Sequence, residues 1–307
     1  MQTKIRIGTR GSPLALAQAE ELRSRLSDSS GMKTEDFEII VIKTSGDRIL
    51  DRALADAGGK ELFTKEIEEA LLDNRIDMAV HSSKDMPTIL PQGLQIGCFL
   101  PREDVRDALI CLKSNSISDL PEGARVGTAS LRRAAQIRNI RPDLEVVLFR
   151  GNVQTRLRKL EEGEADATFL AHAGLKRLGL TEHIAALIEP EDMLPAVGQG
   201  AICVEVRIGD PAIGPLVAAI HDPNTGDCLN AERAFLAALD GSCRTPIAGL
   251  ATIEGDQIRF RGQVLSPDGI VSHKTEKFGP RTDATALGHQ AGSEIKALLP
   301  ADFFEEH

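Results

Sequence analysis

The sequence lacks several features that mark particular classes of protein. Trp and Tyr are absent, and aromatic residues make up 3% of the 307 residues. A surface that stacks nucleic-acid bases on aromatic rings is therefore not expected. The longest uncharged run, Met86 to Pro101, has sixteen residues and is interrupted by proline and glycine, whereas about 20 apolar residues span a bilayer. The first residues show no apolar core of a secretory signal. We expect a cytoplasmic protein with neither nucleic acid nor a membrane as partner.

Cysteine is scarce, and none of the five residues lies in a C-x-x-C motif. This pattern argues against a zinc site and a disulfide framework, so no metal is expected. Cys243 differs from the others, because it follows Asp240-Gly241 and precedes Arg244. A cation beside a thiol in a polar turn favours the reactive thiolate. The remaining four lie in apolar stretches, where a thiol usually serves as a small buried hydrophobe: Cys98, Cys111, Cys203 and Cys228.

Basic residues are concentrated in one segment of an acidic chain. The net charge is −10, and the fractions of 42% apolar and 27% charged residues are typical of a globular protein. Between Arg125 and Arg177, however, eleven Arg and Lys residues outnumber six Asp and Glu residues. Any affinity for anions is therefore local rather than global.

Strand-like and helix-like segments alternate up to about residue 200, which predicts βα units and largely parallel sheets. After residue 222, one helix, three strands and a last helix indicate a separate small α+β domain. Residues 7–18 and 126–136 each contain a strand, a Gly-Thr turn, a Ser cap and a helix. This similarity raises the hypothesis of an internal duplication, with two similar lobes. The alternative is that any two strand-to-helix corners look alike.

Cations and hydroxyls recur directly after the predicted strands. In open α/β sheets, ligands bind outside the carboxyl ends of the strands, and helix N-termini there add to the attraction for anions. We therefore predict a cleft that binds several anionic groups, although a solvated surface is the alternative for any single arginine. The segments are Thr9 to Ser12, His81 to Asp85, Thr128 to Arg133, Arg150 to Asn152, and Ala171 to Arg177.

Asp85 is the one acidic residue among these cations. A structural ion pair with Lys84 is one interpretation. The other is that a fixed anion in a cationic cleft stabilises a substrate atom that becomes positive during the reaction. His81 is expected to be buried and hydrogen-bonded rather than catalytic. The polar stretch 44–61 is typical of a lid or of a merely mobile connection, and Lys60 near its end is placed to reach the cleft.

These motifs together resemble the porphobilinogen deaminase family, also called hydroxymethylbilane synthases, from Ile5 to about Pro300. The resemblance is weaker after residue 250. The segments that carry it are IGTRGSPLALAQ (7–18), GGKELFTKEIEEAL (58–71), AVHSSKDMP (79–87), REDVRDA (102–108), VGTASLRRAAQ (126–136), FRGNVQTRL (149–157), AHAGLKRLGL (171–180), LPAVGQGA (194–201) and DGSCRTPIAG (240–249).

The resemblance implies a transferase of tetrapyrrole and haem biosynthesis. Such an enzyme condenses four porphobilinogen molecules head to tail, releases ammonia, and yields the linear tetrapyrrole hydroxymethylbilane. It builds the product on a dipyrromethane cofactor, which the resemblance attaches through a thioether to Cys243. A sulfur nucleophile suits the capture of an electrophilic methylene. The resemblance also implies a monomer.

The resemblance further implies the domain organisation: two similar periplasmic-binding-protein-like α/β lobes plus a small α+β C-terminal domain. Residues 1–98 and 199–218 form the first lobe, 99–198 the second, and 219–307 the third domain with the cofactor cysteine.

The resemblance assigns residues to three roles. Asp85 is the catalytic carboxylate, which accepts the pyrrole N–H when loss of ammonia leaves a cation. Cofactor binding falls on Cys243, Lys60, Ser82, Lys84, Thr128, Ser130, Arg132, Arg133 and Arg150. Substrate binding falls on Arg10, Ser12, Arg156 and Arg177.

Two other classes of function remain open on the sequence. A non-catalytic solute-binding module also has two lobes around an anion cleft, and fold alone does not decide function. A thiol enzyme that transfers acyl groups would use Cys243, but no nearby histidine motif supports it. The mass of the intact protein separates the three, because only the deaminase carries two extra pyrrole units.

Overall fold

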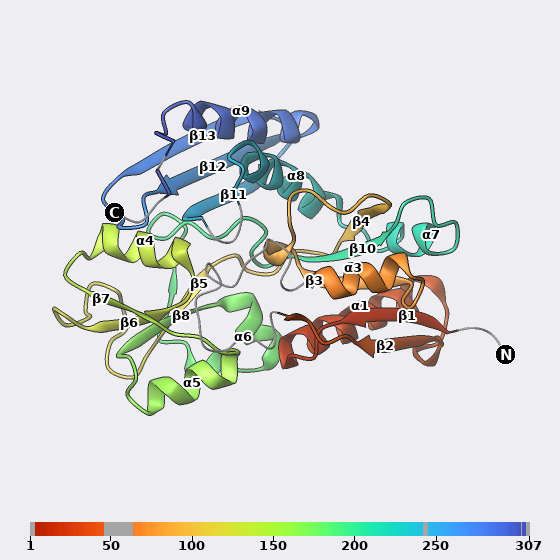
Figure 1. Ribbon diagram of the computed structural model, residues 1–307, viewed down its shortest axis with the longest axis horizontal. Coiled ribbons are helices and arrows are strands. Elements are labelled where there is room, and N and C mark those ends of the chain that lie inside the picture. The colour runs from red at the N-terminus through yellow and green to blue at the C-terminus, as the bar shows by residue number, and fades with distance from the viewer. Residues whose placement is uncertain (1–3, 46–63, 242–244, 302, 305–307) are drawn as a thin grey trace. The chain divides into compact units, whose positions relative to one another are not determined.

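The computed structural model describes residues 4–45, 64–241, 245–301 and 303–304, and contains three β-sheets in these ranges (Figure 1). Two compact units divide the chain. Unit 1 takes the described residues of 1–49, 58–103 and 201–226, and unit 2 takes those of 104–200 and 227–307. Unit 2 therefore includes most of the segments predicted as the second lobe and the third domain, whereas residues 99–103 and 219–226 fall in unit 1. The three-domain boundaries stay a prediction.

Unit 1 is built around a five-stranded sheet in the order β2-β1-β3-β10-β4. Strands β1, β2 and β3 are parallel, whereas β10 runs antiparallel to both of its neighbours. Helices α1 and α7 supply apolar residues to one core layer, and α3 to another. The elements are β1 (Ile5–Thr9), α1 (Pro13–Ser30), β2 (Phe37–Val41), α3 (Lys65–Leu72), β3 (Met78–Ser82), β4 (Leu94–Phe99), β10 (Ile202–Arg207) and α7 (Ile213–Ala218), with short 3-10 helices η1 (Thr34–Asp36) and η2 (Ser83–Asp85).

Helix α1 shows how local sequence sets the first corner of unit 1. Ser12 caps the helix by accepting a hydrogen bond from the Ala15 backbone N–H at 3.3 Å, and Pro13 fits the first turn because it has no N–H to satisfy. Gly31 ends the helix in the left-handed conformation, with φ of 70°. This corner fixes the direction of the chain directly after β1.

Unit 2 contains a second five-stranded sheet, in the order β7-β6-β8-β5-β9. Strands β6, β7 and β8 are parallel, whereas β5 is antiparallel to both β8 and β9. Helix α4 packs on one face through Ile137, and α5 packs on the other through Leu157 and Leu160. The elements are β5 (Asp107–Cys111), β6 (Arg125–Thr128), α4 (Leu131–Ile140), β7 (Glu145–Leu148), α5 (Val153–Glu161), β8 (Ala167–Ala171), α6 (His172–Leu178), η3 (Thr181–His183) and β9 (Ala186–Ile188).

The two five-stranded sheets share one plan. In each, three parallel strands are followed by an antiparallel strand and an edge strand. This common plan is what the duplication hypothesis predicts. The prediction of largely parallel sheets is confirmed, with β5 and β10 as the reversed strands. An antiparallel strand needs no helical crossover to its neighbour, so the βα alternation does not reveal these two.

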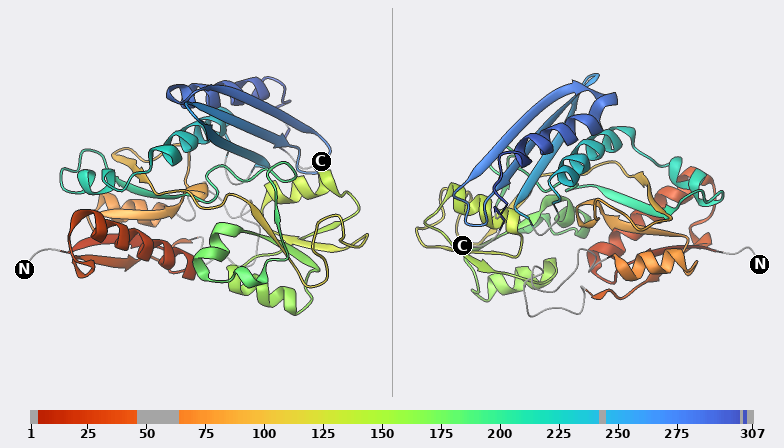
Figure 2. Two further views of the ribbon diagram at one scale, coloured as in Figure 1. Left: turned by 180° about the vertical axis from the view of Figure 1, so that it is seen from behind. Right: turned by 45° about the horizontal axis from the view of Figure 1, so that its top comes forward.

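A three-stranded antiparallel sheet, β11-β12-β13, completes unit 2. Helices α8 and α9 cover one face, as the right-hand view of Figure 2 shows. They pack so closely that a Cβ atom on Gly288 would lie 1.9 Å from the Ala231 carbonyl oxygen. The other face brings Ala248 and Leu250 against Leu194. The elements are α8 (Pro223–Ala238), β11 (Ile247–Glu254), β12 (Gln257–Leu265), β13 (Ser272–Pro280), η4 (Arg281–Asp283) and α9 (Ala284–Lys296).

Within the described ranges, no helix has the length and apolar character needed to cross a membrane.

Candidate active site

In unit 1, predicted site residues gather where β1 and β3 end. The two strands are parallel neighbours, with Ile7 opposite Met78, so the residues that follow them lie at one edge of the sheet. Arg10 and Ser12 follow β1. Ser82 is the last residue of β3, and Lys84 and Asp85 lie in η2.

A buried glutamine holds the end of β3. The Gln18 side chain, 4% exposed, lies on α1 and donates from Nε2 to the Ser82 hydroxyl at 2.8 Å. Sequence reasoning missed Gln18. The signal that could have found it is its position in the helix, since a polar residue there lies on the face that also buries Ala15, Ala19 and Leu22.

Asp85 is partly buried at the end of η2. The Ser83 backbone N–H donates to the Ala201 carbonyl at 3.0 Å, and this bond ties the turn to the start of β10. Within the described part of the chain, no residue donates a hydrogen bond to the Asp85 carboxylate or pairs with it. Asp85 is therefore available to an added ligand, and the interpretation as a structural ion pair with Lys84 finds no support among these contacts.

His81 lies just before this group and is buried. Its Nε2 atom is 3.1 Å from Oε2 of Glu205 on β10, and the two side chains are 5% and 0% exposed. The expectation of a buried, hydrogen-bonded histidine is confirmed. The pair links β3 to β10 beneath Ser82.

In unit 2, predicted site residues gather where β6 and β7 end. Ser130 caps α4 by accepting a hydrogen bond from the Arg133 backbone N–H at 3.4 Å. Thr128 supports this cap, because its hydroxyl accepts from the Ser130 N–H at 3.1 Å. The cap turns α4 so that Arg132 and Arg133, in its first turn, both point inward and are buried.

Arg132 and Arg133 share one carboxylate, that of Asp107 at the start of β5. Arg132 Nη2 donates to Oδ2 at 2.8 Å, and Arg133 Nη2 donates to Oδ1 at 2.7 Å. The Asp107 side chain is fully buried, and the two arginine side chains are 5% and 6% exposed. Burial alone acts to raise the pKa of the Asp107 carboxyl, but the two arginine charges outweigh it and hold this pKa well below its usual range.

Neighbouring backbone completes this cluster. Arg132 Nη1 donates to the Leu194 carbonyl at 2.8 Å, and Arg133 Nη1 donates to the Phe169 carbonyl at 2.8 Å. Gln199 donates to Asp107 Oδ1 at 3.0 Å. Sequence reasoning missed both Asp107 and Gln199 as members of the site. The signal for Asp107 was a charged residue directly before a predicted apolar strand.

Arg150 and Arg156 add positive charge that no described carboxylate balances. The Arg150 Nη1 atom is buried and has no hydrogen-bond partner. Arg156, in α5, donates from Nε to the Gly151 carbonyl at 3.0 Å. Burial, together with the charges of Arg133 and Arg150, lowers the pKa of Arg156 to about 10. A lowered arginine pKa marks a place where an added anion would stabilise the charged form.

Arg177, in α6, donates from Nη2 to the Gly200 carbonyl at 3.3 Å. The predicted site residues that the structure describes therefore fall into two groups. Unit 1 contains Arg10, Ser12, Ser82, Lys84 and Asp85. Unit 2 contains Thr128, Ser130, Arg132, Arg133, Arg150, Arg156 and Arg177. Cys243 and Lys60 lie outside the described residues. Their predicted roles, and the common cleft predicted for the two groups, stay predictions.

The chain is an α/β protein in which two five-stranded sheets share one plan and are followed by a small α+β C-terminal domain, as the sequence predicted. Residues 5–214 match the model of the porphobilinogen deaminase dipyrromethane cofactor binding domain, and residues 227–297 match that of the porphobilinogen deaminase C-terminal domain. A porphobilinogen deaminase from Paracoccus denitrificans is 57% identical over 304 residues, which cover 99% of this chain and 97% of the relative. The chain belongs to the porphobilinogen deaminase family.

The family defines the chain's activity as that of a transferase, a hydroxymethylbilane synthase, which acts on porphobilinogen and carries a dipyrromethane cofactor. The predicted family, function and cofactor are confirmed.

Solved structures with a similar fold share little sequence with the chain. The methionine-binding protein MetQ is 14% identical, with a TM-score of 0.45, and covers 71% of this chain and 89% of its own. The VFT2 domain of BvgS from Bordetella pertussis is 15% identical, with a TM-score of 0.43, and covers 71% and 85%. At this level of similarity neither carries an argument about function.

Proposed function

We propose that the arginines of unit 2 hold the carboxylates of the cofactor and of the growing chain, while Asp85 stabilises the positive charge that forms on each incoming porphobilinogen. The observation that carries this proposal is the group of Arg133, Arg150 and Arg156. In this group, one guanidinium nitrogen of Arg150 is buried without a hydrogen-bond partner, and the pKa of Arg156 is lowered. Such a group fits a ligand that bears several carboxylates.

The residues fit the cofactor in different ways. Arg133 already uses three nitrogen atoms on Asp107 and Phe169, so it contributes mainly charge. Arg150 has a free buried donor and supplies a direct hydrogen bond. When bound, the dipyrromethane would supply the free terminal pyrrole carbon to which the first new unit is joined, and each added unit would then supply that carbon for the next. The residues proposed to hold it are Cys243, Lys60, Ser82, Lys84, Thr128, Ser130, Arg132, Arg133 and Arg150.

Asp85 acts on the substrate. When the C–N bond of the aminomethyl group breaks, the nitrogen leaves with the electron pair as ammonia, and positive charge spreads onto the pyrrole nitrogen. A carboxylate that accepts the pyrrole N–H stabilises this cation. The same oxygen atoms are suited to move the protons that the leaving amine gains and the new ring junction loses. Arg10, Ser12, Arg156 and Arg177 are proposed to hold the substrate carboxylates.

We also propose that the chain acts as a monomer in the cytoplasm. Every residue that the family resemblance assigns to the reaction has a counterpart in this one sequence, which supports the proposal.

Replacing Cys243 tests the proposed attachment of the cofactor. The purified wild-type protein should exceed its sequence mass by two pyrrole units in intact-mass spectrometry, and Cys243→Ala should show the bare sequence mass. A thioether needs the Cys243 sulfur, so no other thiol should substitute for it. Cys111→Ala is the matched control, because Cys111 is a partly exposed free thiol, and it should keep the added mass. Bare mass in the wild type after reconstitution with porphobilinogen would instead favour a solute-binding or acyl-transfer protein.

Replacing Arg156 tests the anion site. Arg156→Gln should raise KM for porphobilinogen by about 10-fold to 100-fold, because a charge-assisted hydrogen bond contributes about 1.5–3 kcal/mol. Steady-state kinetics would measure it. Arg158→Gln is the matched control on the same helix, since the Arg158 side chain is 67% exposed and pairs with Glu162. Equal KM values for the two variants would contradict a role for Arg156 in substrate binding.

A further inference from the structure

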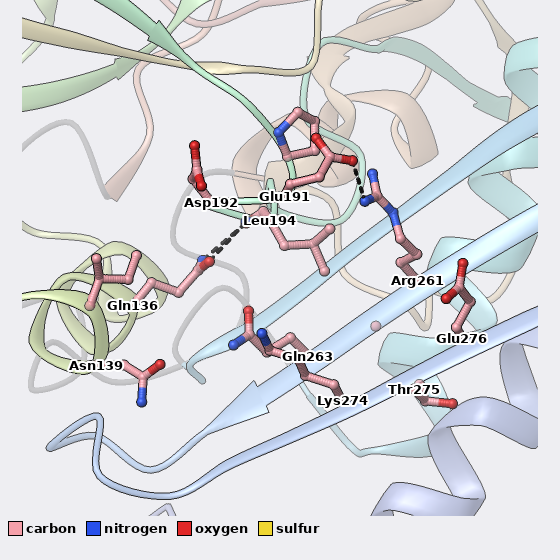
Figure 3. A pocket seen from close by; sticks show the side chains of 13 residues that line it. Gln136, Asn139, Glu191, Asp192, Leu194, Arg261, Gln263, Lys274, Thr275 and Glu276 are labelled. Carbon is pink, nitrogen blue, oxygen red and sulfur yellow. Dashed lines mark hydrogen bonds and ion pairs between the residues drawn. The ribbon is translucent and has the colours of Figure 1, made fainter. Parts of the chain in front are cut away.

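A pocket of about 340 Å³ lies in unit 2, between α4 and the face of the β11–β13 sheet that α8 and α9 leave uncovered (Figure 3). Its volume is within the range of small-molecule sites. Helix α4 supplies one wall, β12 and β13 supply another, and the segment around residues 190–194 closes one side. None of the residues assigned above to catalysis, cofactor or substrate lines it.

One cation of the pocket lining has no described partner. Arg261 pairs with Glu191 at 2.6 Å, and Glu276 pairs with Arg259. Each of these four charges is therefore balanced by its ion-pair partner. Lys274 lies on β13 directly opposite Gln263 on β12. Figure 3 shows the polar ends of these two side chains close together. Among the described residues, no carboxylate pairs with Lys274.

Ile140, Pro190 and Leu194 add apolar surface to the lining, beside the polar Gln136 and Asn139. The pocket therefore has two parts. Lys274 and the Gln263 amide are suited to bind an oxygen anion, and the apolar residues are suited to contact a ring or a short chain. Asp192 also belongs to the lining, but Figure 3 places its carboxylate beyond Gln136, away from Lys274.

Hydrogen bonds connect this pocket to the buried arginines. The Gln136 side chain lines the pocket, accepts from the Leu194 N–H at 2.9 Å and donates to the Leu194 carbonyl at 3.0 Å. The same carbonyl accepts from Arg132 at 2.8 Å. A ligand that contacts Gln136 and Leu194 therefore touches the residue whose carbonyl oxygen accepts the hydrogen bond from Arg132.

The loop between β12 and β13 also fixes α4 from the pocket side. Asn139 donates to the Gly269 carbonyl, and Arg138 donates to the Pro267 carbonyl, both at 2.8 Å. A Cβ atom on Gly269 would lie 2.5 Å from the Ala135 carbonyl oxygen, so the loop and the helix are in close contact. These contacts couple the position of the loop to that of α4.

We propose that this pocket binds a small organic carboxylate with a planar apolar body, anchored by Lys274, and that the bound ligand modulates the enzyme through Gln136 and Leu194. The binding stands independently of the roles proposed above. The modulation rests on the proposed role of Arg132.

Indole-3-acetate is a suitable probe, because the chain has neither Trp nor Tyr and indole fluorescence therefore reports the probe alone. Fluorescence anisotropy with the holoenzyme should show saturable binding. Lys274 is exposed, so Lys274→Gln should weaken that binding by about 1.5-fold to fivefold, the range expected for one exposed ion pair. Lys277→Gln is the matched control, since Lys277 lies on the same strand and pairs with Glu294, and it should bind as the wild type does.

Two further measurements complete the test. Tryptamine, which has the same ring and a positive charge, should bind more weakly than indole-3-acetate, and tighter binding would overturn the proposal. Saturating probe should change KM for porphobilinogen at least about twofold in the wild type, and Lys274→Gln should need a higher probe concentration for the same change. If Arg156→Gln abolishes probe binding and Lys274→Gln leaves it unchanged, the probe occupies the anion site of the reaction instead. That result would overturn the pocket proposal and leave the proposed function intact.

Discussion

Asp85→Asn should reduce turnover of porphobilinogen by at least about 100-fold while the protein still folds, since loss of one electrostatic contact to a transition state costs about that much. The amide has nearly the shape of the carboxylate but carries no negative charge to stabilise the substrate cation. No described residue donates a hydrogen bond to the Asp85 carboxylate, so its replacement breaks no described contact. The release of ammonia under single-turnover conditions would measure the chemical step directly.

Asp73→Asn provides the control for this experiment. Asp73 also lies in unit 1 and is exposed, and its only described ion pair is with Arg75 at 3.7 Å. It should retain wild-type turnover, and both variants should unfold at the wild-type denaturant concentration. Normal ammonia release by Asp85→Asn would remove Asp85 from the reaction. A fall in turnover matched by a fall in stability would assign Asp85 a structural role instead.

The sequence predicted most elements because the apolar patterns are strong. The strand 94–99 has the predicted bounds, and the predicted strand at 76–80 begins two residues later, at Met78. Strand β9 was missed, because it has three residues and is too short for a period-two pattern. Strands β5 and β10 were found, but their antiparallel direction depends on pairing with segments distant in sequence.

The candidate site was predicted less completely than the fold. The motifs marked residues with side chains suited to bind anions, such as Arg150 and Arg156. They did not mark the groups that position those side chains. Gln18 reaches Ser82 from 64 residues away, and Gln199 reaches Asp107 from 92 residues away. Contacts across such sequence distances arise from tertiary packing, which no local spacing reveals.

The cluster of Asp107, Arg132 and Arg133 leads to the second prediction of large effect. Asp107→Asn should lower the free energy of unfolding by about 3–5 kcal/mol, the cost of removing one partner from a buried ion pair. Both arginines would then be buried without a compensating charge, because the Asp107 oxygens accept from both of them within 2.8 Å. Chemical denaturation near neutral pH would measure the change.

The dependence of this loss on pH follows from the pKa of Asp107. Although burial acts to raise it, Arg132 and Arg133 hold this pKa below its usual range in the folded protein. A carboxyl with a lowered native pKa stabilises the fold above its unfolded pKa of about 3.9 and loses that contribution as the pH falls toward the native value. The difference in stability between the wild type and Asp107→Asn should therefore be complete above about pH 5 and shrink on acidification.

Asp143→Asn is the control that separates the loss of a buried ion pair from the loss of an ion pair near the surface. Asp143 also pairs with an arginine in unit 2, Arg141, at 2.6 Å, but the two side chains are 30% and 20% exposed. Ion pairs that water reaches contribute little to stability, so this variant should be nearly as stable as the wild type. If the two variants lose equal stability, burial does not amplify the pairing at Asp107. If Asp107→Asn instead keeps wild-type stability at neutral pH, the two arginines do not depend on Asp107 for their buried position.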